Sequence, residues 1–428
     1  MPEPLRLGIA GLGTVGVGVV KIVQRHARLL GARTGREISI TAVCARFRDK
    51  ARGLRLADFV WVDDPVALAQ RDDVDVFVEL IGGADGVAKA ATEAAIAAGK
   101  DVVTANKAML AHHGQALASA AEAQGRVIRF EAAVAGGIPV IKTLTEGLAG
   151  NEITRVMGVL NGTCNYILTR MQAENLSYGE VFKAAEKLGY LEADPSLDVG
   201  GIDAAHKLAL LASIAFGCQV AFEAVEVEGI ERITIEDIGL AADMGFRIKL
   251  LGVAQMTGSG LEQRISPCLV PAASPLGQLE GAANMVVLEG DSAGQIVLRG
   301  AGAGQGPTAS AVMADVVDLA RGLRVPTFGQ PAATLVRPSP AHSAVPAPYY
   351  LRMSLLDKPG ALAKIATVLG DAGISIDRMR QYRHVDPTAP VLIVTHKTSG
   401  SALRDAISAM AGTDVLVGEP VAIRIEAL

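Results

Sequence analysis

The chain has 428 residues, enough for two or three domains, and half of them are hydrophobic although only 4% are aromatic. Its net charge is -5, and no run of five or more basic residues occurs, so nucleic-acid binding has no electrostatic basis. The longest apolar run, near residues 208–225, is interrupted by polar residues, which argues against a membrane span. Four widely spaced cysteines and an acidic, proline-containing N-terminus predict a cytoplasmic location.

The first third of the chain alternates between apolar strands and helices. Strands are predicted at 5–11, 38–45, 74–83, 101–106 and 126–134, and helices at 14–30, 91–100 and 107–124. This alternation is typical of a parallel sheet that is covered by helices on both faces. We therefore expect an α/β fold that begins with a Rossmann-type nucleotide-binding domain over residues 1–139.

The middle of the chain has a different pattern. A strand begins near residue 152, Asn161-Gly162 predicts a turn, and helices are predicted at 177–190 and 202–216. Two runs at 285–290 and 295–300 predict antiparallel strands. We expect an α+β domain for substrate binding and dimerisation over 140–310, and a helical return to the nucleotide-binding domain over 311–336.

The last quarter begins with a proline-rich segment. Residues 337–348 contain four prolines and have neither helical nor strand periodicity, which predicts a semi-rigid linker. From residue 349 to 428 the pattern is strand, helix, strand, strand and helix, and it predicts a ferredoxin-like βαββαβ module.

A glycine-rich turn lies between the first strand and the first helix. Gly11 permits the tight turn, Gly13 lets a pyrophosphate approach the backbone, and Gly16 allows close packing of helix and strand. With Thr14 and Val15 these glycines are the predicted cofactor-binding turn. The alternative is a glycine-rich turn that binds nothing.

The end of the second strand bears on which cofactor binds. Selection of NAD usually needs an acidic residue at this point, which binds the ribose 2′-hydroxyl. The chain has Arg46 and Arg48 there instead, and Arg46 is suited to a 2′-phosphate. NADP(H) is therefore favoured over NAD(H), unless these arginines are ordinary surface cations.

Three polar residues follow the strand at 101–106. Thr104, Asn106 and Lys107 would lie beyond the carboxyl end of the strand, where open α/β sheets bind ligands. Lys107 opens a helix, and a cation there opposes the helix dipole unless an anion faces it. We expect Thr104 and Lys107 near the cofactor, or else Lys107 is a solvated surface lysine.

Four acids precede a single lysine on an apolar helix: Glu192, Asp194, Asp198 and Asp203, followed by Lys207. Asp203 and Lys207 are four residues apart and share a helix face, where they could form an ordinary salt bridge. The rest of the helix is apolar, which instead favours a pocket for a cationic group. In that pocket Lys207 would be the proton donor to a substrate oxygen.

Several motifs together resemble homoserine dehydrogenase. They are GLGTVG, VVTANKAML, EAAVAGGIPVI, NGTCNYIL, YLEADPSLDVGGIDAAHKLALLA and GAGAGQGPTASAV, and they cover most of residues 5–335. The resemblance implies reversible interconversion of L-homoserine and L-aspartate 4-semialdehyde with NAD(P)(H), on the route to threonine, methionine and isoleucine.

The resemblance also implies roles for particular residues. Lys207 and Lys107 would be catalytic, and the substrate would be bound by Glu192, Asp203, Asp198, Gly162 and Thr163. Gly189 and Gly304 would lie near the cofactor. Sodium or another monovalent cation would be held by backbone carbonyls of Glu131, Val134, Gly136 and Ile138.

The segment DKPGALAKIATVLGDAGISI resembles an ACT domain, an amino-acid-sensing module. The resemblance implies threonine as effector, bound where two modules pair, by Asp357, Pro359, Gly360, Gly373 and Ile374. It also implies a homodimer or homotetramer. The alternative is a dimerisation module without a ligand.

Two rival hypotheses remain at this stage. Cys164 could be a nucleophile of the aspartate-semialdehyde dehydrogenase type, although no histidine is placed by pattern to activate it. A catalytically inactive amino-acid sensor is disfavoured, because Lys107, Glu192, Asp203 and Lys207 are all present.

Overall fold

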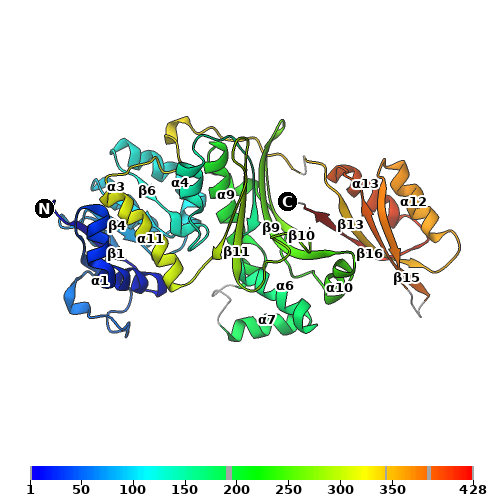
Figure 1. Ribbon diagram of the computed structural model, residues 1–428, viewed down its shortest axis with the longest axis horizontal. Helices are drawn as coiled ribbons and strands as arrows, with labels where there is room; N and C mark the ends of the chain where they lie inside the picture. The colour runs from blue at the N-terminus through cyan, green and yellow to red at the C-terminus, as the bar shows by residue number, and fades with distance from the viewer. Residues whose placement is uncertain (1, 189–194, 343–344, 383–386, 427–428) are drawn as a thin grey trace.

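The computed structural model describes residues 2–188, 195–342, 345–382 and 387–426. Figure 1 shows three regions in a row, with the N-terminal sheet at one end, a second sheet in the middle and the C-terminal module at the other end. No helix within these ranges is long and apolar enough to cross a membrane.

The N-terminal region is built on a parallel sheet with the order β3-β2-β1-β4-β5-β6. Its strands are β1 (Leu5–Ala10), β2 (Ile38–Cys44), β3 (Val60–Trp61), β4 (Val76–Glu79), β5 (Asp101–Thr104) and β6 (Ile128–Arg129). The predicted Rossmann-type sheet is confirmed. The strand predicted over 126–134 is wrong in length, because the chain leaves the sheet after β6 and forms a short 3₁₀ helix, η2 (Glu131–Ala133).

Helices cover both faces of this sheet, and one of them comes from much later in the chain. They are α1 (Thr14–Thr34), α2 (Pro65–Ala69), α3 (Val87–Ala97), α4 (Lys107–Ala123) and α11 (Gln305–Ala320), with the 3₁₀ turn η1 (Leu56–Asp58). In Figure 1 α11 lies beside α1. A Cβ on Gly18 would lie only 2.8 Å from the Cβ of Ala309, so the missing side chain lets these two helices approach closely.

The central sheet is antiparallel over the order β12-β11-β7-β9-β10. Its strands are β7 (Ile153–Val159), β9 (Phe246–Thr257), β10 (Gly260–Pro271), β11 (Ala283–Gly290) and β12 (Gly294–Ala301), with the short β8 (Glu226–Val227) beside β10. The remaining helices here are α5 (Val140–Lys142), η3 (Thr143–Gly147), α6 (Gly162–Glu174), α7 (Tyr178–Lys187), α8 (Pro195–Val199), α9 (Ile202–Phe216), η4 (Phe222–Ala224), α10 (Ile235–Asp243) and η5 (Ala332–Thr334).

The C-terminal module has the ferredoxin-like strand order β16-β13-β15-β14. It consists of β13 (Tyr349–Leu356), α12 (Ala361–Asp371), β14 (Ile376–Gln381), β15 (Thr388–Thr395), α13 (Gly400–Ala411) and β16 (Leu416–Ile425). Beyond the predicted layout, β16 pairs in parallel with β10, so the module's sheet continues the central sheet. Figure 1 shows the chain returning to the centre of the molecule at its C-terminal end.

Part of the proline-rich segment, around residues 339–341, is hydrogen-bonded to the central sheet. The Leu261 N–H donates to the Ser339 carbonyl at 2.8 Å, and the Ala341 N–H donates to the Leu261 carbonyl at 2.9 Å. Two backbone hydrogen bonds to one residue of β10 hold this part of the segment against the sheet.

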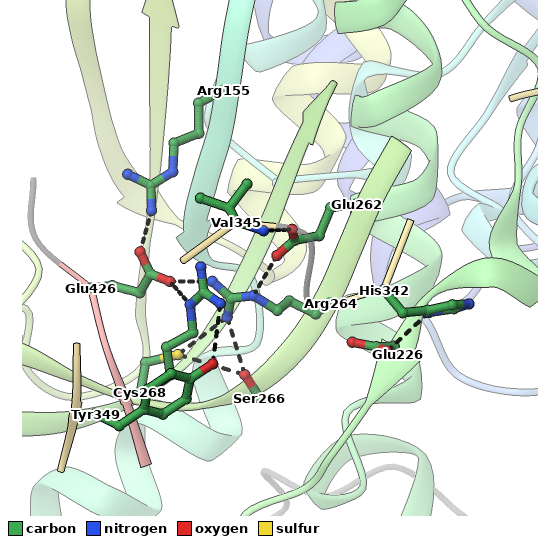
Figure 2. A network of polar contacts seen from close by, with 11 residues as sticks. Arg155, Glu226, Glu262, Arg264, Ser266, Cys268, His342, Val345, Tyr349 and Glu426 are labelled. Atoms are coloured by element: carbon green, nitrogen blue, oxygen red, sulfur yellow. Dashed lines mark hydrogen bonds and ion pairs between the residues drawn. The ribbon is translucent and has the colours of Figure 1, made fainter. Parts of the chain in front are cut away.

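A buried ionic network joins β16 to the central strands (Figure 2). The Glu426 carboxylate, 5% exposed, accepts hydrogen bonds from Arg155 of β7, Arg264 of β10 and Arg424 of β16. Arg264 also contacts Glu262, whose second oxygen accepts from the Val345 N–H at 3.0 Å. The C-terminal module is therefore connected to the central sheet by backbone pairing and by buried charge.

Candidate active site

A cavity of about 540 Å³ lies between the N-terminal sheet and the central region. It is lined by Val15, Ala105, Lys107, Ala132, Ala133, Val134, Asn161, Gly162, Thr163, Asp198, Asp203, Lys207, Ala282, Asn284, Gly302, Ala303, Gly304 and Thr308. The predicted substrate residues Gly162, Thr163, Asp198 and Asp203 thus share one space with both predicted catalytic lysines.

The centre of the cavity is a carboxylate shared by two lysines. Lys207 Nζ donates to Asp203 Oδ2 at 2.7 Å, and Lys107 Nζ lies 3.0 Å from Asp203 Oδ1. Lys107 comes from the first turn of α4, and Asp203 and Lys207 come from the first two turns of α9. The anion expected opposite Lys107 is therefore Asp203, a residue of the protein itself.

The residues at the end of β7 hold this group from the other side. The Leu160 carbonyl accepts from Lys207 Nζ at 2.9 Å, and Asn284 Nδ2 donates to the same carbonyl at 3.0 Å. Asn161 Nδ2 donates to Asp198 Oδ1 and to Asp203 Oδ2, both at 3.0 Å. Neither asparagine was indicated as a site residue by the sequence. The sequence placed Asn161 in a turn, whereas in the structure Asn161 caps α6.

The charge state of Asp203 follows from its surroundings. Burial opposes ionisation, but Lys207 and Lys107 outweigh it and hold the pKa of this carboxyl well below its usual value. Asp203 is thus ionised at neutral pH. The lining residues then carry two cations, Lys107 and Lys207, and two anions, Asp198 and Asp203.

Neither of two alternative reactive groups fits the cavity. Burial, and then the neighbouring Asp198 charge, raise the pKa of the Cys164 thiol well above its usual value, and the thiol donates to the Asp198 carbonyl at 3.3 Å. Burial also lowers the pKa of His206 to about 4, and its ring packs on Phe222 at 4.4 Å between centroids. A buried neutral thiol is a poor nucleophile, which disfavours the aspartate-semialdehyde dehydrogenase mechanism.

The glycine-rich turn has the geometry that a dinucleotide requires. Gly11 has φ +107, and a Cβ there would lie 2.3 Å from the Leu80 carbonyl oxygen. A Cβ on Gly16 would lie 2.0 Å from the Gly11 oxygen, whereas the space around Gly13 is open. Gly13 caps α1, Val15 reaches the cavity, and the helix N-terminus is available for phosphate groups.

The loop after β2 is rich in arginine and tied to the glycine-rich turn. Arg46 and Arg48 are both exposed. Arg52, missed in the sequence, donates from Nε to the Leu12 carbonyl at 3.1 Å and from Nη1 to the Lys50 carbonyl at 2.8 Å. The guanidinium groups of Arg48 and Arg52 lie 5.8 and 5.9 Å from the centre of the Trp61 ring. These contacts hold a basic loop beside the turn.

Thr104 lies close to the cavity but its hydroxyl is engaged elsewhere. The hydroxyl donates to Glu79 Oε2 at 2.5 Å and accepts from the Asn106 N–H at 2.9 Å. Asn106 in turn caps α4 by accepting from the Met109 N–H at 3.0 Å. The side chains of Thr104 and Asn106 thus shape the turn that presents Lys107, and contact between Thr104 and a cofactor stays a prediction.

The predicted cation loop lies beside the cavity, which Val134 lines. The Glu131 carboxylate accepts from the backbone N–H groups of Ile141 at 3.0 Å and Lys142 at 2.8 Å, and cation binding by the backbone carbonyl of Glu131 stays a prediction. Gly136 has φ +56 and packs on Gly302, while the Ile138 carbonyl already accepts from the Val140 N–H at 2.8 Å. Within the described ranges no group of three His, Cys, Asp or Glu side chains could hold a metal ion.

The predicted effector residues lie at both ends of one helix. Asp357, Pro359 and Gly360 precede α12, and Gly373 and Ile374 follow it. Eleven helical residues separate the two ends by about 16 Å. The two groups therefore lie apart within one module, and a ligand bound by both stays a prediction.

Gly189, Glu192 and Asp194 lie outside the described residues. Gly304, a predicted cofactor residue, caps α11 with φ +120 and lines the cavity.

Comparison with known proteins identifies the family. The family model described as homoserine dehydrogenase matches residues 139–317, that of the homoserine dehydrogenase NAD-binding domain matches 11–131, and that of the ACT domain matches 349–412. The homoserine dehydrogenase of Neisseria gonorrhoeae is 42% identical over 100% of this chain and 99% of its own length. The chain belongs to the homoserine dehydrogenase family.

Solved structures of the family agree with the fold. A homoserine dehydrogenase from Thiobacillus denitrificans has a TM-score of 0.93 at 40% identity, over 99% of this chain and 98% of that one. The Pseudomonas aeruginosa homoserine dehydrogenase is 41% identical over the full length of both chains. The protein is thus an oxidoreductase with a nicotinamide-dinucleotide-binding Rossmann domain and a C-terminal ACT domain.

Proposed function

We propose that the protein reversibly interconverts L-homoserine and L-aspartate 4-semialdehyde with NADP(H), and that Lys207 moves the proton at the substrate oxygen. The observation that carries this proposal is the carboxylate of Asp203 shared by Lys207 and Lys107, in a cavity beside the dinucleotide turn. The reaction belongs to the formation of threonine, methionine and isoleucine, in the cytoplasm.

Lys207 is suited to proton transfer by its remaining hydrogen-bonding capacity. A lysine ammonium has three N–H groups. The Leu160 carbonyl and Asp203 take two of them, which leaves one for a substrate oxygen in the cavity that Lys207 lines. When the aldehyde is reduced, its oxygen gains negative charge and Lys207 donates a proton to it; when the alcohol is oxidised, Lys207 takes that proton back. A bound nicotinamide supplies or accepts the hydride.

The other lining charges suit an amino-acid substrate. Lys107 is 3.0 Å from Asp203 and faces the same cavity, where it stabilises negative charge that develops on the substrate oxygen. The carboxylates of Asp198 and Asp203 favour the substrate ammonium group, with Gly162 and Thr163 at the start of α6 beside them. Glu192 completes the proposed substrate set.

The basic loop supports NADP(H) as the cofactor. Arg46, Arg48 and Arg52 lie in the loop after β2, where an NAD-selective protein would carry an acidic residue. Arg46 is the proposed partner of the 2′-phosphate. A solved archaeal homoserine dehydrogenase, 26% identical with a TM-score of 0.65, was determined in complex with NADPH.

Regulation by threonine is part of the proposal. Threonine would bind the ACT module between two copies of the chain, which act as a homodimer or homotetramer. Its effect would reach the active site through β16 and Glu426. Glu426 binds Arg155 of β7, and β7 leads directly to Leu160, whose carbonyl binds Lys207.

Sodium or another monovalent cation would be held by the carbonyls of the 131–138 loop.

A coupled pair of assays tests the proposed reaction. NADPH oxidation is followed with L-aspartate 4-semialdehyde, and NADP reduction with L-homoserine, both without phosphate. Activity in both directions is expected. Inactivity in both directions would refute the proposal, and activity that needs phosphate would favour an aspartate-semialdehyde dehydrogenase.

A further inference from the structure

We infer that Asn161 is a positioning residue, whose side-chain amide sets the orientation of the Asp203 and Asp198 carboxylates and thereby decides which oxygen of Asp203 faces each lysine. The inference rests on the proposed function, because it concerns the residues that hold Lys207 and Lys107 in place.

Both N–H groups and the oxygen of the Asn161 amide are hydrogen-bonded. Its Nδ2 donates one hydrogen bond to Asp198 Oδ1 and one to Asp203 Oδ2, each at 3.0 Å. Its Oδ1 accepts from the Cys164 N–H at 2.8 Å, which caps α6. Asn161 is 3% exposed, so the loss of these contacts leaves the two carboxylates without this protein donor in a nearly buried place.

The position of Asn161 ties the carboxylates to the same backbone that holds Lys207. Asp203 Oδ2 receives both Asn161 Nδ2 and Lys207 Nζ, so Oδ1 is turned toward Lys107 at 3.0 Å. The preceding residue, Leu160, binds Lys207 Nζ through its carbonyl. Two consecutive residues at the end of β7 therefore hold the acid and the lysine in one geometry.

Asparagine is the only common helix-capping residue that can both cap α6 and donate hydrogen bonds to two carboxylates. Serine, threonine and aspartate also cap helices through a side-chain oxygen. None of them has two N–H donors to offer to a pair of carboxylates. At position 161 an aspartate would keep the cap of α6 and place a third carboxylate against Asp198 and Asp203.

The test compares three variants with the wild type. Asn161→Ser keeps a cap oxygen and loses both donors, and Asn161→Asp keeps the cap and adds a charge. Asn165→Ser is the matched control, because Asn165 is equally buried on α6 but donates to the Leu279 and Gly281 carbonyls outside the cavity. For each we measure kcat, KM, NADPH affinity by fluorescence, thermal unfolding and the pH profile of kcat.

We expect Asn161→Ser to lower kcat by about 100-fold, which is the cost of a displacement of about 1 Å in a catalytic group. NADPH affinity should stay at the wild-type value. Asn161→Asp should also move the acidic limb of the kcat profile to higher pH. The added carboxylate opposes ionisation of Asp203, while Lys207 from α9 and Lys107 from α4 favour it. Asn165→Ser should lower stability and leave the pH profile unmoved.

Two results would overturn the inference: wild-type kcat in Asn161→Ser, or an unmoved acidic limb in Asn161→Asp. If Asn161→Ser does not fold, Asn161→Thr carries the same comparison, because it also keeps a cap oxygen. An inactive wild type would refute the proposed function, whereas an active wild type with unaffected Asn161 variants would refute only the role of Asn161.

Discussion

Replacing Lys207 by methionine removes the proton donor and keeps most of the volume of the side chain. Lys207 is 9% exposed, and its ammonium group contacts only protein atoms and the cavity. In the variant Asp203 keeps Lys107 at 3.0 Å and Asn161 at 3.0 Å, so the carboxylate is not left without partners. The change therefore acts on proton transfer more than on folding.

The expected loss follows from the task of the lysine. A positioned general acid or base contributes about 10²–10⁴-fold to a rate, which corresponds to about 3–5 kcal/mol of activation free energy. We expect kcat to fall within that range in both directions. NADPH affinity should be unchanged, because the dinucleotide turn lies on α1 and not on α9.

The assay is steady-state kinetics with L-homoserine and NADP, with NADPH binding measured by fluorescence. Lys249→Met is the matched control, since Lys249 is 4% exposed on β9 and binds Asn165 Oδ1 at 2.9 Å away from the cavity. That variant should lose stability and keep kcat. If Lys207→Met keeps a kcat near the wild-type value, Lys207 does not carry the proton.

Arg46→Ala should weaken NADP binding by about 10- to 100-fold, the value of a charge-assisted hydrogen bond, and leave NAD binding unchanged. Arg55→Ala, in the same loop, is the control, and equal losses for both cofactors would remove the 2′-phosphate argument. Glu426→Gln should keep basal kcat and threonine binding but reduce threonine inhibition by at least about fivefold; unchanged inhibition beside the control Glu419→Gln would exclude this route. Asp203→Asn should lower the free energy of unfolding by about 3 kcal/mol at pH 7. The pKa of Asp203 is lower in the folded than in the unfolded protein, so the stability difference between wild type and variant should be complete above the unfolded pKa of about 3.9. It should vanish as the pH falls through the folded-state pKa. A stability difference that does not change with pH would contradict this assignment.

Features that depend on local sequence could be predicted closely. The helix predicted over 202–216 is α9 with the same bounds, because apolar periodicity and the glycines at 201 and 217 mark both ends. The roles of Gly11 and Gly16 also follow from the short strand–turn–helix pattern around them. In these segments the interactions that decide the structure lie within a few residues of each other.

Contacts between distant segments could not be predicted. The pairing of β16 with β10 joins residues about 156 apart, such as Cys268 and Arg424. Nothing in either strand marks its partner, and the prolines at 337–348 suggested a separate module. The Glu426 network could not be predicted for the same reason, because its arginines come from three different strands. The structure thus argues against removing the ACT module whole, which would expose β10 and leave Arg155 and the buried Arg264 without Glu426.

Asn161 illustrates a signal that was present and given the wrong interpretation. An Asn-Gly pair predicts a turn, but an asparagine before a helix is equally a cap. Only the approach of α8 and α9 shows that its amide meets two carboxylates. The helix dipole at Lys107 predicted a facing anion, and the structure supplies one in Asp203.

The most direct test of the central claim is a crystal structure of the protein with NADP and L-homoserine bound. We predict that homoserine occupies the cavity of about 540 Å³. Its hydroxyl oxygen should lie within about 2.6–3.2 Å of Lys207 Nζ, the reach of a general acid or base, with its reacting carbon facing the nicotinamide. Homoserine bound elsewhere, or with its hydroxyl beyond the reach of Lys207, would contradict the assigned chemistry.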